Sequence, residues 1–163
     1  MKPFALFGVT AGLSYFGASL IGEKAVIKAL GTDNPKEFLD IELKARTYTQ
    51  LDSYLNECME MSQVSWSPDK RLLKFLYVPN PKAQGYPGIS HGGFTYSIST
   101  VLAQEYQRLT GDTGKVRNTY IRYNAPIKVE NLYSAEVSRD KDHIKVVITD
   151  KTDKKCSTFI AAV

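Results

Sequence analysis

The spacing of apolar residues in the middle of the chain predicts a strand followed by a long helix. Residues 71–78 are dense in apolar and aromatic side chains and lie between two proline-containing runs, which is typical of a strand between breakers. Residues 94–109 contain neither proline nor glycine, and Gly111 follows them. Within this segment apolar side chains recur every three or four residues, at Phe94, Ile98, Val101, Leu102 and Leu109. This spacing puts them on one face of a helix, which we expect to end at Gly111.

The rest of the chain alternates between apolar and polar residues, as half-buried strands do. Four strands are predicted, at residues 116–123, 133–137, 144–148 and 156–162, with turn-forming residues between them. On the last strand the alternation assigns one face to Cys156, Thr158, Ile160 and Ala162. We expect the four strands to follow one another in an antiparallel meander. One long helix against such a sheet is an α+β fold.

The N-terminal part has a different character. Residues 3–22 carry no charge and are rich in Phe, Leu, Ala, Val and Gly, a run just long enough to span a bilayer as a helix. Three interpretations stay open for it: a membrane anchor, a targeting segment that is removed, or a hydrophobic helix packed on a partner protein. The sequence Asn34-Pro35-Lys36-Glu37 has the form of a helix start, so a helix through about residue 45 is expected.

These patterns divide the chain into three parts. We expect residues 1–30 to form a hydrophobic helix, for which a membrane span is one of the open interpretations, residues 31–57 a helical linker, and residues 58–163 the folded domain. The boundary is open at residues 48–61, which fit a short helix, whereas residues 58–64 fit equally the start of a strand.

Composition narrows the class of function. The 163 residues are 43% hydrophobic and 23% charged, which is ordinary for one globular domain. The formal net charge is only +4, and the basic residues are scattered, so we exclude nucleic acid as a partner. Cys58 and Cys156 lie far apart without a Cys/His grouping, which predicts neither a zinc site, nor any other metal site, nor a disulfide. A reducing compartment fits these cysteines best.

Two short motifs carry a resemblance to a known family. Gly88-x-x-His91-Gly92-Gly93 stands at the start of the predicted helix, and Arg122-Tyr123-x-x-Pro126 closes the next strand. With this helix length and the strands that follow, the sequence from about residue 58 onward resembles the hotdog-fold thioesterases, and within them the mitochondrial acyl-CoA thioesterase superfamily members. The resemblance implies a hotdog fold, in which an antiparallel sheet wraps around one long central helix, and a fatty acyl-CoA thioester as substrate or ligand with no further cofactor. It also implies a mitochondrial location. Together with the uncharged run at residues 3–22, this location predicts association with a mitochondrial membrane, with the inner membrane favoured.

The chemistry of the first motif can be stated from its residues. Attack on a thioester turns its carbonyl oxygen into an oxyanion, and backbone N–H groups at a helix N-terminus are free donors that the helix dipole reinforces. Gly92 is the expected oxyanion donor and Gly93 a substrate-binding residue, because neither has a side chain to block close approach. His91 either shapes the loop or donates a hydrogen bond to the substrate.

Thr100 is the main departure from the family. It stands nine residues after His91, where the resembling families have the Asp or Glu that acts as general base or nucleophile. A hydroxyl cannot accept the proton of water as a carboxylate does, and the loss of a general base costs about 10²- to 10⁴-fold in rate. Glu105 is the only carboxylate of the same helix, but it is turned by roughly 140° from Thr100. The helper hydroxyl of the family falls on Val116, unless a local shift brings in Asn118, our second candidate substrate-binding residue, or Thr119.

Helix geometry also bears on assembly. Gly92 and Thr100 lie roughly 12 Å apart along one helix, too far for one carbonyl to touch both. The family's solution is a dimer in which two chains share each site, so we expect a homodimer or a pairing with another hotdog subunit. Three functions remain: a membrane-associated acyl-CoA thioesterase with His91, Gly92 and Thr100 in the catalytic positions, a catalytically inactive structural subunit of a mitochondrial membrane complex, or an acyl-CoA-binding module.

Overall fold

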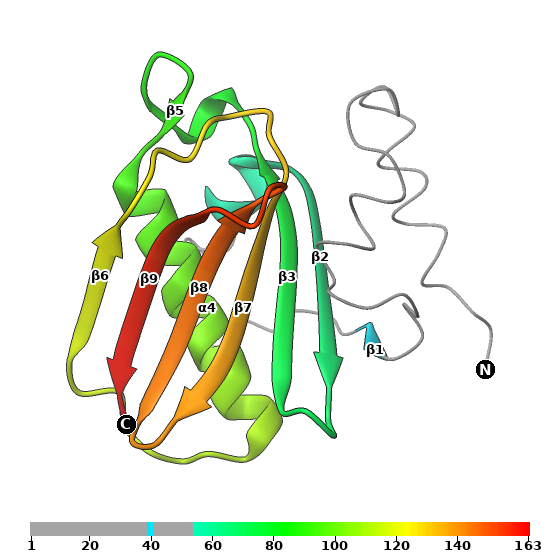
Figure 1. The fold of residues 1–163 in the computed structure, drawn as a ribbon, viewed down its shortest axis with the longest axis vertical. Coiled ribbons are helices and arrows are strands. Elements are labelled where there is room, and N and C mark those ends of the chain that lie inside the picture. Colours follow the sequence, from blue (N-terminus) through cyan, green and yellow to red (C-terminus); the bar gives the residue numbers. More distant parts are fainter. Residues whose placement is uncertain (1–38, 41–53) are drawn as a thin grey trace.

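A computed structural model of the chain describes residues 39–40 and 54–163. Within these ranges, one seven-stranded antiparallel sheet and one long helix make up the fold (Figure 1). The strands lie in the order β1-β2-β3-β7-β8-β9-β6, and a small second sheet pairs β4 with β5. The predicted α+β class, with a sheet against one central helix, is therefore confirmed.

The strands have the following bounds. They are β1 (Leu39–Asp40), β2 (Met59–Ser67), β3 (Leu72–Pro79), β4 (Gln84–Tyr86), β5 (Ile89–Ser90), β6 (Thr119–Tyr123), β7 (Tyr133–Asp140), β8 (His143–Asp150) and β9 (Lys155–Ala162). A short 3₁₀ helix, η2 (Pro81–Ala83), precedes β4. Residues 54–57 form a helical turn before β2, so the boundary that the sequence left open falls between that turn and a strand that begins at Met59.

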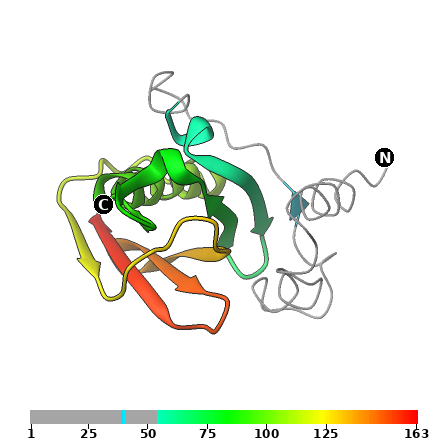
Figure 2. The same ribbon diagram turned by 90° about the horizontal axis from the view of Figure 1, so that it is seen from above.

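The central helix α4 (Gly92–Thr110) packs along the concave face of the sheet. Figure 2 shows the sheet curling around it when the molecule is seen from above. Gly111 ends the helix with a left-handed backbone, at φ 69°, as its position after the apolar pattern predicts. The helix side chains that face the sheet are those of the apolar pattern, and Phe94, Ile98, Val101 and Leu102 are all buried.

Aromatic and branched side chains fill the space between helix and sheet. Tyr77 packs on Phe75 and Phe94, with ring centroids 5.3 and 6.3 Å apart. Near the other end of the helix, Trp66 meets Tyr106 edge to face. Strand β8 contributes three fully buried residues, Ile144, Val146 and Ile148, as its alternation predicts.

The meander prediction is correct for β7, β8 and β9 but wrong for the first of the four strands. Strand β6 pairs with β9 at the sheet edge, and β7 pairs with β3 instead. Strand β6 is also shorter than predicted, because residues 112–118 form a loop before it. Alternation identifies a strand but carries no information about its neighbours, which the nine-residue connection after β6 leaves free.

The predicted buried face of β9 is also wrong. Phe159 and Ala161 are fully buried beneath α4, whereas Ile160 and Thr158 are only partly covered on the other face. Both faces of β9 carry apolar residues, and an irregularity in the pairing at Ile148 and Thr149 shifts the register at its start. With apolar residues on both faces, a period of two cannot select the inner one.

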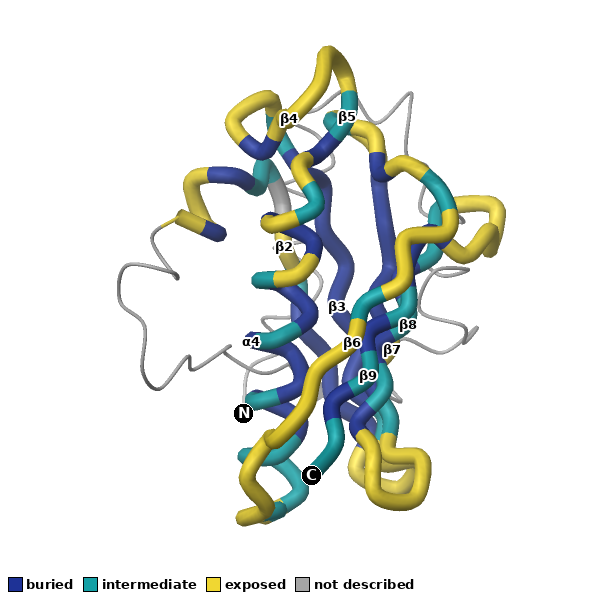
Figure 3. The backbone as a smooth tube through the Cα atoms, turned by 90° about the vertical axis from the view of Figure 1, so that its left-hand side faces the viewer, coloured by how far each residue is buried: buried dark blue, intermediate teal, exposed yellow. Residues whose placement is uncertain are grey.

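Among the strands of the large sheet from β2 onward, the edge strand β6 is the most exposed (Figure 3). Tyr120 and Tyr123 are 61% and 51% exposed. Among the described residues β6 has a partner on one side only, which leaves its outer backbone edge open.

The hydrophobic run at residues 3–22 and the helix expected at residues 35–45 lie outside the described residues. Of the described helices, none is long and apolar enough to cross a membrane.

Candidate functional site

A cleft of about 480 Å³ opens at the N-terminus of α4. Both sequence motifs meet in its wall: His91 and Gly92 come from the helix start, and Tyr123 and Pro126 from the end of β6 and the loop that follows. The other lining residues are Gly85, Tyr86, Ile89, Ser90, Thr95, Asn124, Ala125 and Ile127. No Asp, Glu, Lys or Arg stands in this wall, so its electrostatics are set by backbone dipoles, one imidazole and hydroxyl groups.

His91 caps the helix with its ring. Its Nδ1 accepts a hydrogen bond from the Gly93 N–H at 2.9 Å, which satisfies one of the unpaired donors of the first turn. Because Nδ1 is the acceptor, a neutral ring carries its proton on Nε2. His91 therefore performs the loop-shaping role and keeps an N–H donor for a ligand, but its Nε2 has no lone pair to act as a base in this tautomer.

Gly92 supplies the free donor of the site. The carbonyl of His91 accepts from the N–H groups of Phe94 and Thr95, at 3.0 and 3.4 Å. Across a trans peptide the N–H points opposite to the carbonyl, so the Gly92 N–H points away from the helix body. It has no acceptor among the described residues. The Gly93 N–H is already taken by His91, so Gly92 is the better placed of the two glycines to bind a ligand oxygen.

The space beside each glycine is occupied by a side chain of the protein itself. A Cβ on Gly92 would lie 3.2 Å from the Tyr123 hydroxyl oxygen, and a Cβ on Gly93 only 2.8 Å from His91 Nδ1. From the sequence, glycine is expected at these positions because it lets the substrate approach closely. The structure gives a second reason for glycine, since these side chains of the protein crowd both positions.

Tyr123 joins β6 to the helix start. Its hydroxyl donates to the Gly92 carbonyl oxygen at 2.8 Å, across 31 residues of sequence. Partial burial, followed by the nearby Tyr96, raises the pKa of Tyr123, so this hydroxyl stays a proton donor at neutral pH. Sequence reasoning singled out the Tyr-x-x-Pro motif but gave Tyr123 no role, since the contact with Gly92 is visible only in three dimensions.

Ser90 adds an unsatisfied polar group to the same wall. The residue is 8% exposed, and its Oγ is buried without a hydrogen-bond partner among the described residues. Its backbone is held by the Ile127 carbonyl, which accepts from the Ser90 N–H at 2.7 Å. The sequence gave no signal for this residue beyond its place before His91.

Thr100 lies outside the cleft wall. Its hydroxyl donates to the Tyr96 carbonyl at 3.0 Å, one turn back along α4. Glu105 cannot take its place, because it faces the interior at 2% exposure and both of its oxygens accept from Arg108. The rotation expected from helix geometry is thus confirmed for Glu105.

Asn118 and Thr119 also lie away from the cleft wall. Asn118 is exposed in the loop before β6, and its carbonyl accepts from the Ala162 N–H at 2.9 Å. The Thr119 hydroxyl is paired with that of Tyr96 at 2.9 Å. A ligand-binding role for Asn118 and Gly93 stays a prediction, since no ligand contact is available to test it.

Three aromatic side chains of α4 and β6 leave the cleft open. Phe94 is buried in the core, Tyr96 packs on Phe159, and Tyr120 lies exposed on β6. None of the three lines the cleft. Within the described part of the chain, no group of three His, Cys, Asp or Glu side chains is arranged to hold a metal ion.

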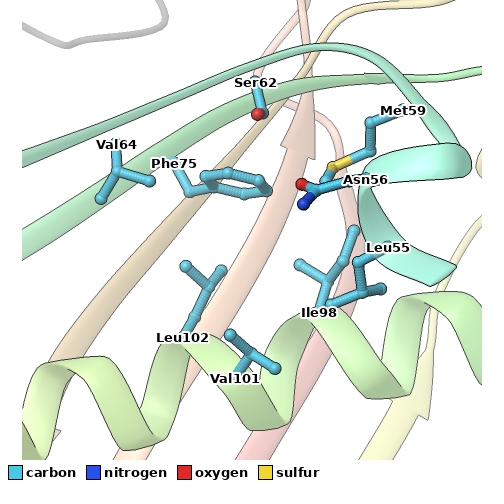
Figure 4. Close-up of a pocket in the computed structure, with 9 residues that line it drawn as sticks. All are labelled: Leu55, Asn56, Met59, Ser62, Val64, Phe75, Ile98, Val101 and Leu102. Atoms are coloured by element: carbon cyan, nitrogen blue, oxygen red, sulfur yellow. The ribbon is translucent and has the colours of Figure 1, made fainter. Parts of the chain in front are cut away.

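A second cavity, of about 190 Å³, lies between α4 and the N-terminal strands (Figure 4). Ile98, Val101 and Leu102 rise from the helix toward Phe75 and Val64 of the sheet, and Leu55 closes one end. Asn56 and Ser62 are its only side chains with nitrogen or oxygen, and no titratable residue lines it. The cavity suits an apolar guest and offers no group for acid–base chemistry.

Comparisons with known proteins identify the architecture. No family model matches the sequence, and no curated protein matches it. Among solved structures, a hypothetical thioesterase with coenzyme A from Streptococcus pneumoniae is 13% identical with a TM-score of 0.57, over 68% of this chain and 90% of that one. The PaaI protein of the Escherichia coli phenylacetic acid degradation operon is 13% identical with a TM-score of 0.55, over 69% of this chain and 87% of that one. A thioesterase from Haemophilus influenzae is 11% identical with a TM-score of 0.55, covering 70% and 80%.

The chain has the hotdog fold. The structural likeness to these thioesterase-superfamily neighbours extends over 90% of the Streptococcus pneumoniae chain and 87% of the PaaI chain. At these identities the likeness establishes the hotdog architecture alone, so the activity has to be argued from the site.

Proposed function

We propose that the protein is an acyl-CoA thioesterase-like hotdog protein that binds the thioester group of a fatty acyl-CoA in the cleft at the start of α4. The observation that carries the proposal is the unpaired Gly92 N–H, which lies at a helix N-terminus in a wall without charged side chains. A carbonyl oxygen is the acceptor that such a donor favours, and the helix dipole strengthens the bond as the oxygen gains negative charge. The His91 Nε2–H offers a second donor from the same wall.

The solved structures are consistent with this ligand class. The Streptococcus pneumoniae protein is described with coenzyme A, and it shares the fold over 90% of its length. That finding concerns the neighbour and reaches this chain only as support. No cofactor other than the coenzyme A thioester enters the proposal.

Hydrolysis is a separate step from binding, and a single chain is poorly equipped for it. Water needs a base to take its proton, and the only carboxylate of α4, Glu105, is paired with Arg108 in the interior. The Thr100 hydroxyl already donates to a backbone carbonyl. We therefore propose binding with little or no turnover by this chain alone, and we keep a catalytically inactive accessory subunit as the second candidate.

A second subunit is part of the proposal. The open edge and exposed tyrosines of β6 support pairing with another hotdog chain, because an unpaired strand edge is a template for strand addition. Such a partner would bring groups to the cleft that one chain does not hold. We propose a homodimer or a hetero-oligomer of this kind.

The cellular location is proposed from the sequence alone. The uncharged run at residues 3–22 supports attachment to a membrane, and the family resemblance favours the mitochondrial inner membrane. Carbonate extraction of isolated mitochondria, compared between the full chain and a variant with Leu6→Lys and Leu13→Lys, tests the attachment. Release of the full chain into the carbonate supernatant would contradict it.

Hydrolysis and binding should be measured together. Acyl-CoA substrates from C2 to C16 are offered to the wild type, Thr100→Ala, Thr100→Asp and the matched uncharged control Thr100→Asn. We expect the wild type to bind acyl-CoA with negligible turnover, and Thr100→Asp alone to gain activity, by about 10²-fold or more if a general base is restored. Robust wild-type turnover that survives Thr100→Ala would refute the view that this position disables the chemistry. Absence of acyl-CoA binding at every chain length would favour the accessory-subunit function.

A further inference from the structure

The peptide group between Gly92 and Gly93 is held by side chains at both of its polar atoms. Its carbonyl oxygen accepts from the Tyr123 hydroxyl at 2.8 Å, and its N–H donates to His91 Nδ1 at 2.9 Å. One of these side chains comes from the residue before the helix and the other from β6. The peptide is therefore fixed both by its own turn and by a distant element of the fold.

This peptide controls the direction of the neighbouring donor. The free N–H of Gly92 is separated from the Gly92 carbonyl by the two soft dihedrals of a glycine, the residue with the widest choice of backbone conformations. Two glycines in sequence at a helix start would sample several orientations if nothing held them. Fixing the carbonyl of Gly92 on one side and the helix bonds of His91 on the other leaves one direction for the N–H between them.

The contact with Tyr123 is close enough to crowd a side chain at position 92. A Cβ there would lie 3.2 Å from the Tyr123 hydroxyl oxygen and 3.3 Å from the ring carbon that bears it. Tyr123 also lines the cleft, together with Gly92. Glycine at position 92 and tyrosine at position 123 are thus two halves of one arrangement.

We infer that Tyr123 is a positioning residue, whose hydroxyl holds the Gly92 carbonyl and so aims the unpaired Gly92 N–H at the carbonyl oxygen of a bound acyl thioester. The inference rests on the proposed function for its ligand but not for its geometry. We call the hydrogen bond from the Tyr123 hydroxyl to the Gly92 carbonyl the Tyr123 clamp. With this clamp the Gly92 N–H already points in the binding direction before the ligand arrives. Without it, binding of the thioester oxygen has to order the two glycines first.

The fold provides a matched control. Tyr96 on α4 and Thr119 on β6 share a hydroxyl–hydroxyl hydrogen bond of 2.9 Å, and neither residue lines the cleft. Tyr123→Phe and Tyr96→Phe each remove one hydroxyl that ties α4 to β6. If Tyr123 only attached β6 to α4, the two variants would show the same glycine order parameters and the same ligand preference. If Tyr123 positions the Gly92 N–H, only Tyr123→Phe should change them.

The first measurement needs no ligand. Backbone ¹⁵N relaxation of the full chain reports the order parameters of Gly92 and Gly93, which we expect near 0.85 in the wild type and in Tyr96→Phe, and below about 0.6 in Tyr123→Phe. Unchanged order parameters in Tyr123→Phe would overturn the inference whatever the ligand is.

The second measurement isolates the thioester oxygen. Affinities are compared for hexanoyl-CoA and for S-hexyl-CoA, a thioether that lacks only the carbonyl oxygen. We expect the wild type and Tyr96→Phe to prefer hexanoyl-CoA by up to about tenfold, the worth of one neutral hydrogen bond, and Tyr123→Phe to lose most of that preference. A wild type that does not distinguish the two compounds would refute the proposed function, while a fall in order parameter in Tyr123→Phe would still support the clamp. Equal preference in all three proteins would overturn the positioning role.

A double substitution guards against a variant that merely folds poorly. Gly92→Ala should lower the melting temperature, because its Cβ meets the Tyr123 hydroxyl, and adding Tyr123→Phe should recover at least part of that loss. Additive losses would show that the close contact does not govern position 92, and would overturn this part of the inference.

Discussion

The ion pair between Glu105 and Arg108 allows a test of whether Glu105, the only carboxylate of α4, serves the stability of the fold. The Glu105 side chain is 2% exposed, while that of Arg108 is 26% exposed. Two hydrogen bonds join them: Nε of Arg108 donates to one carboxylate oxygen at 2.8 Å and a terminal nitrogen donates to the other. The pair also raises the pKa of Arg108, chiefly through the hydrogen bond to Glu105, so the guanidinium remains charged.

The two partners should respond unequally to removal. Arg108→Met keeps most of the aliphatic stem but leaves a carboxylate in the interior without its cation, which costs about 3 kcal/mol, the lower end of the range for broken buried pairs. Glu105→Met leaves a guanidinium that can turn to water, so we expect a cost of about 1 kcal/mol. The double variant removes both charges and should lie within about 1 kcal/mol of the wild type, because a buried pair is often replaced by apolar residues without loss.

Urea unfolding followed by circular dichroism at pH 7 gives the four free energies of this cycle. These costs predict a coupling energy of roughly 3 to 5 kcal/mol between the two positions, with Arg108→Met the least stable of the four proteins. Additive costs, or an Arg108→Met variant no less stable than Glu105→Met, would refute this prediction.

Three further predictions concern Ser90, Asp150 and the two cysteines. Ser90→Ala should not destabilise the fold, because its Oγ has no partner to lose, and a cost above about 1 kcal/mol in urea unfolding would contradict this. Burial acts to raise the pKa of Asp150, but hydrogen bonds from Thr152 and Lys154 outweigh it and lower that pKa. The ionised carboxylate therefore stabilises the fold above its unfolded pKa of about 3.9. This contribution is lost as the pH falls through the lower folded pKa. The stability lost in Asp150→Asn should therefore be larger at pH 7 than at pH 3, and an equal loss at both would be evidence against it. Burial raises the pKa of the thiols of Cys58 and Cys156, so labelling by a thiol reagent at pH 7.5 should require unfolding, and rapid reaction of the native protein would show otherwise.

The elements with strong local signals were predictable from the sequence. The helix pattern from Phe94 to Leu109 and the stop at Gly111 correspond to α4, and the strand between prolines corresponds to β3. These signals are local, because a period of 3.6 residues or a bounded apolar run is complete within the element itself. Strand neighbours are not local, and so the pairing of β6 with β9 escaped the prediction.

The residues of the candidate site also differ in whether a local sequence signal predicts them. His91 and Gly92 were placed at the helix start from a motif whose chemistry is readable in a few adjacent residues. The roles of Tyr123 and Ser90 depend on contacts across the fold, and no spacing in the sequence announces them. Asn118 was named as the residue that a local shift from Val116 would bring to the site, and it lies in a loop outside the cleft wall. The expected position assumed an extended strand there, whereas the strand begins only at Thr119.

The two glycines of the motif show why a motif and an activity have to be argued separately. A glycine beside a ligand site has two explanations, close approach of the ligand or close packing of the protein, and here the packing is sufficient for both positions. Gly93 makes room for the capping ring of His91, and Gly92 makes room for Tyr123. A chain without a carboxylate at position 100 would therefore still favour glycine at both positions, so their presence is no argument for turnover. What speaks for a ligand is the one donor that this packing leaves unpaired, the Gly92 N–H, and what speaks against hydrolysis by one chain is the Thr100 hydroxyl that is bound to its own helix.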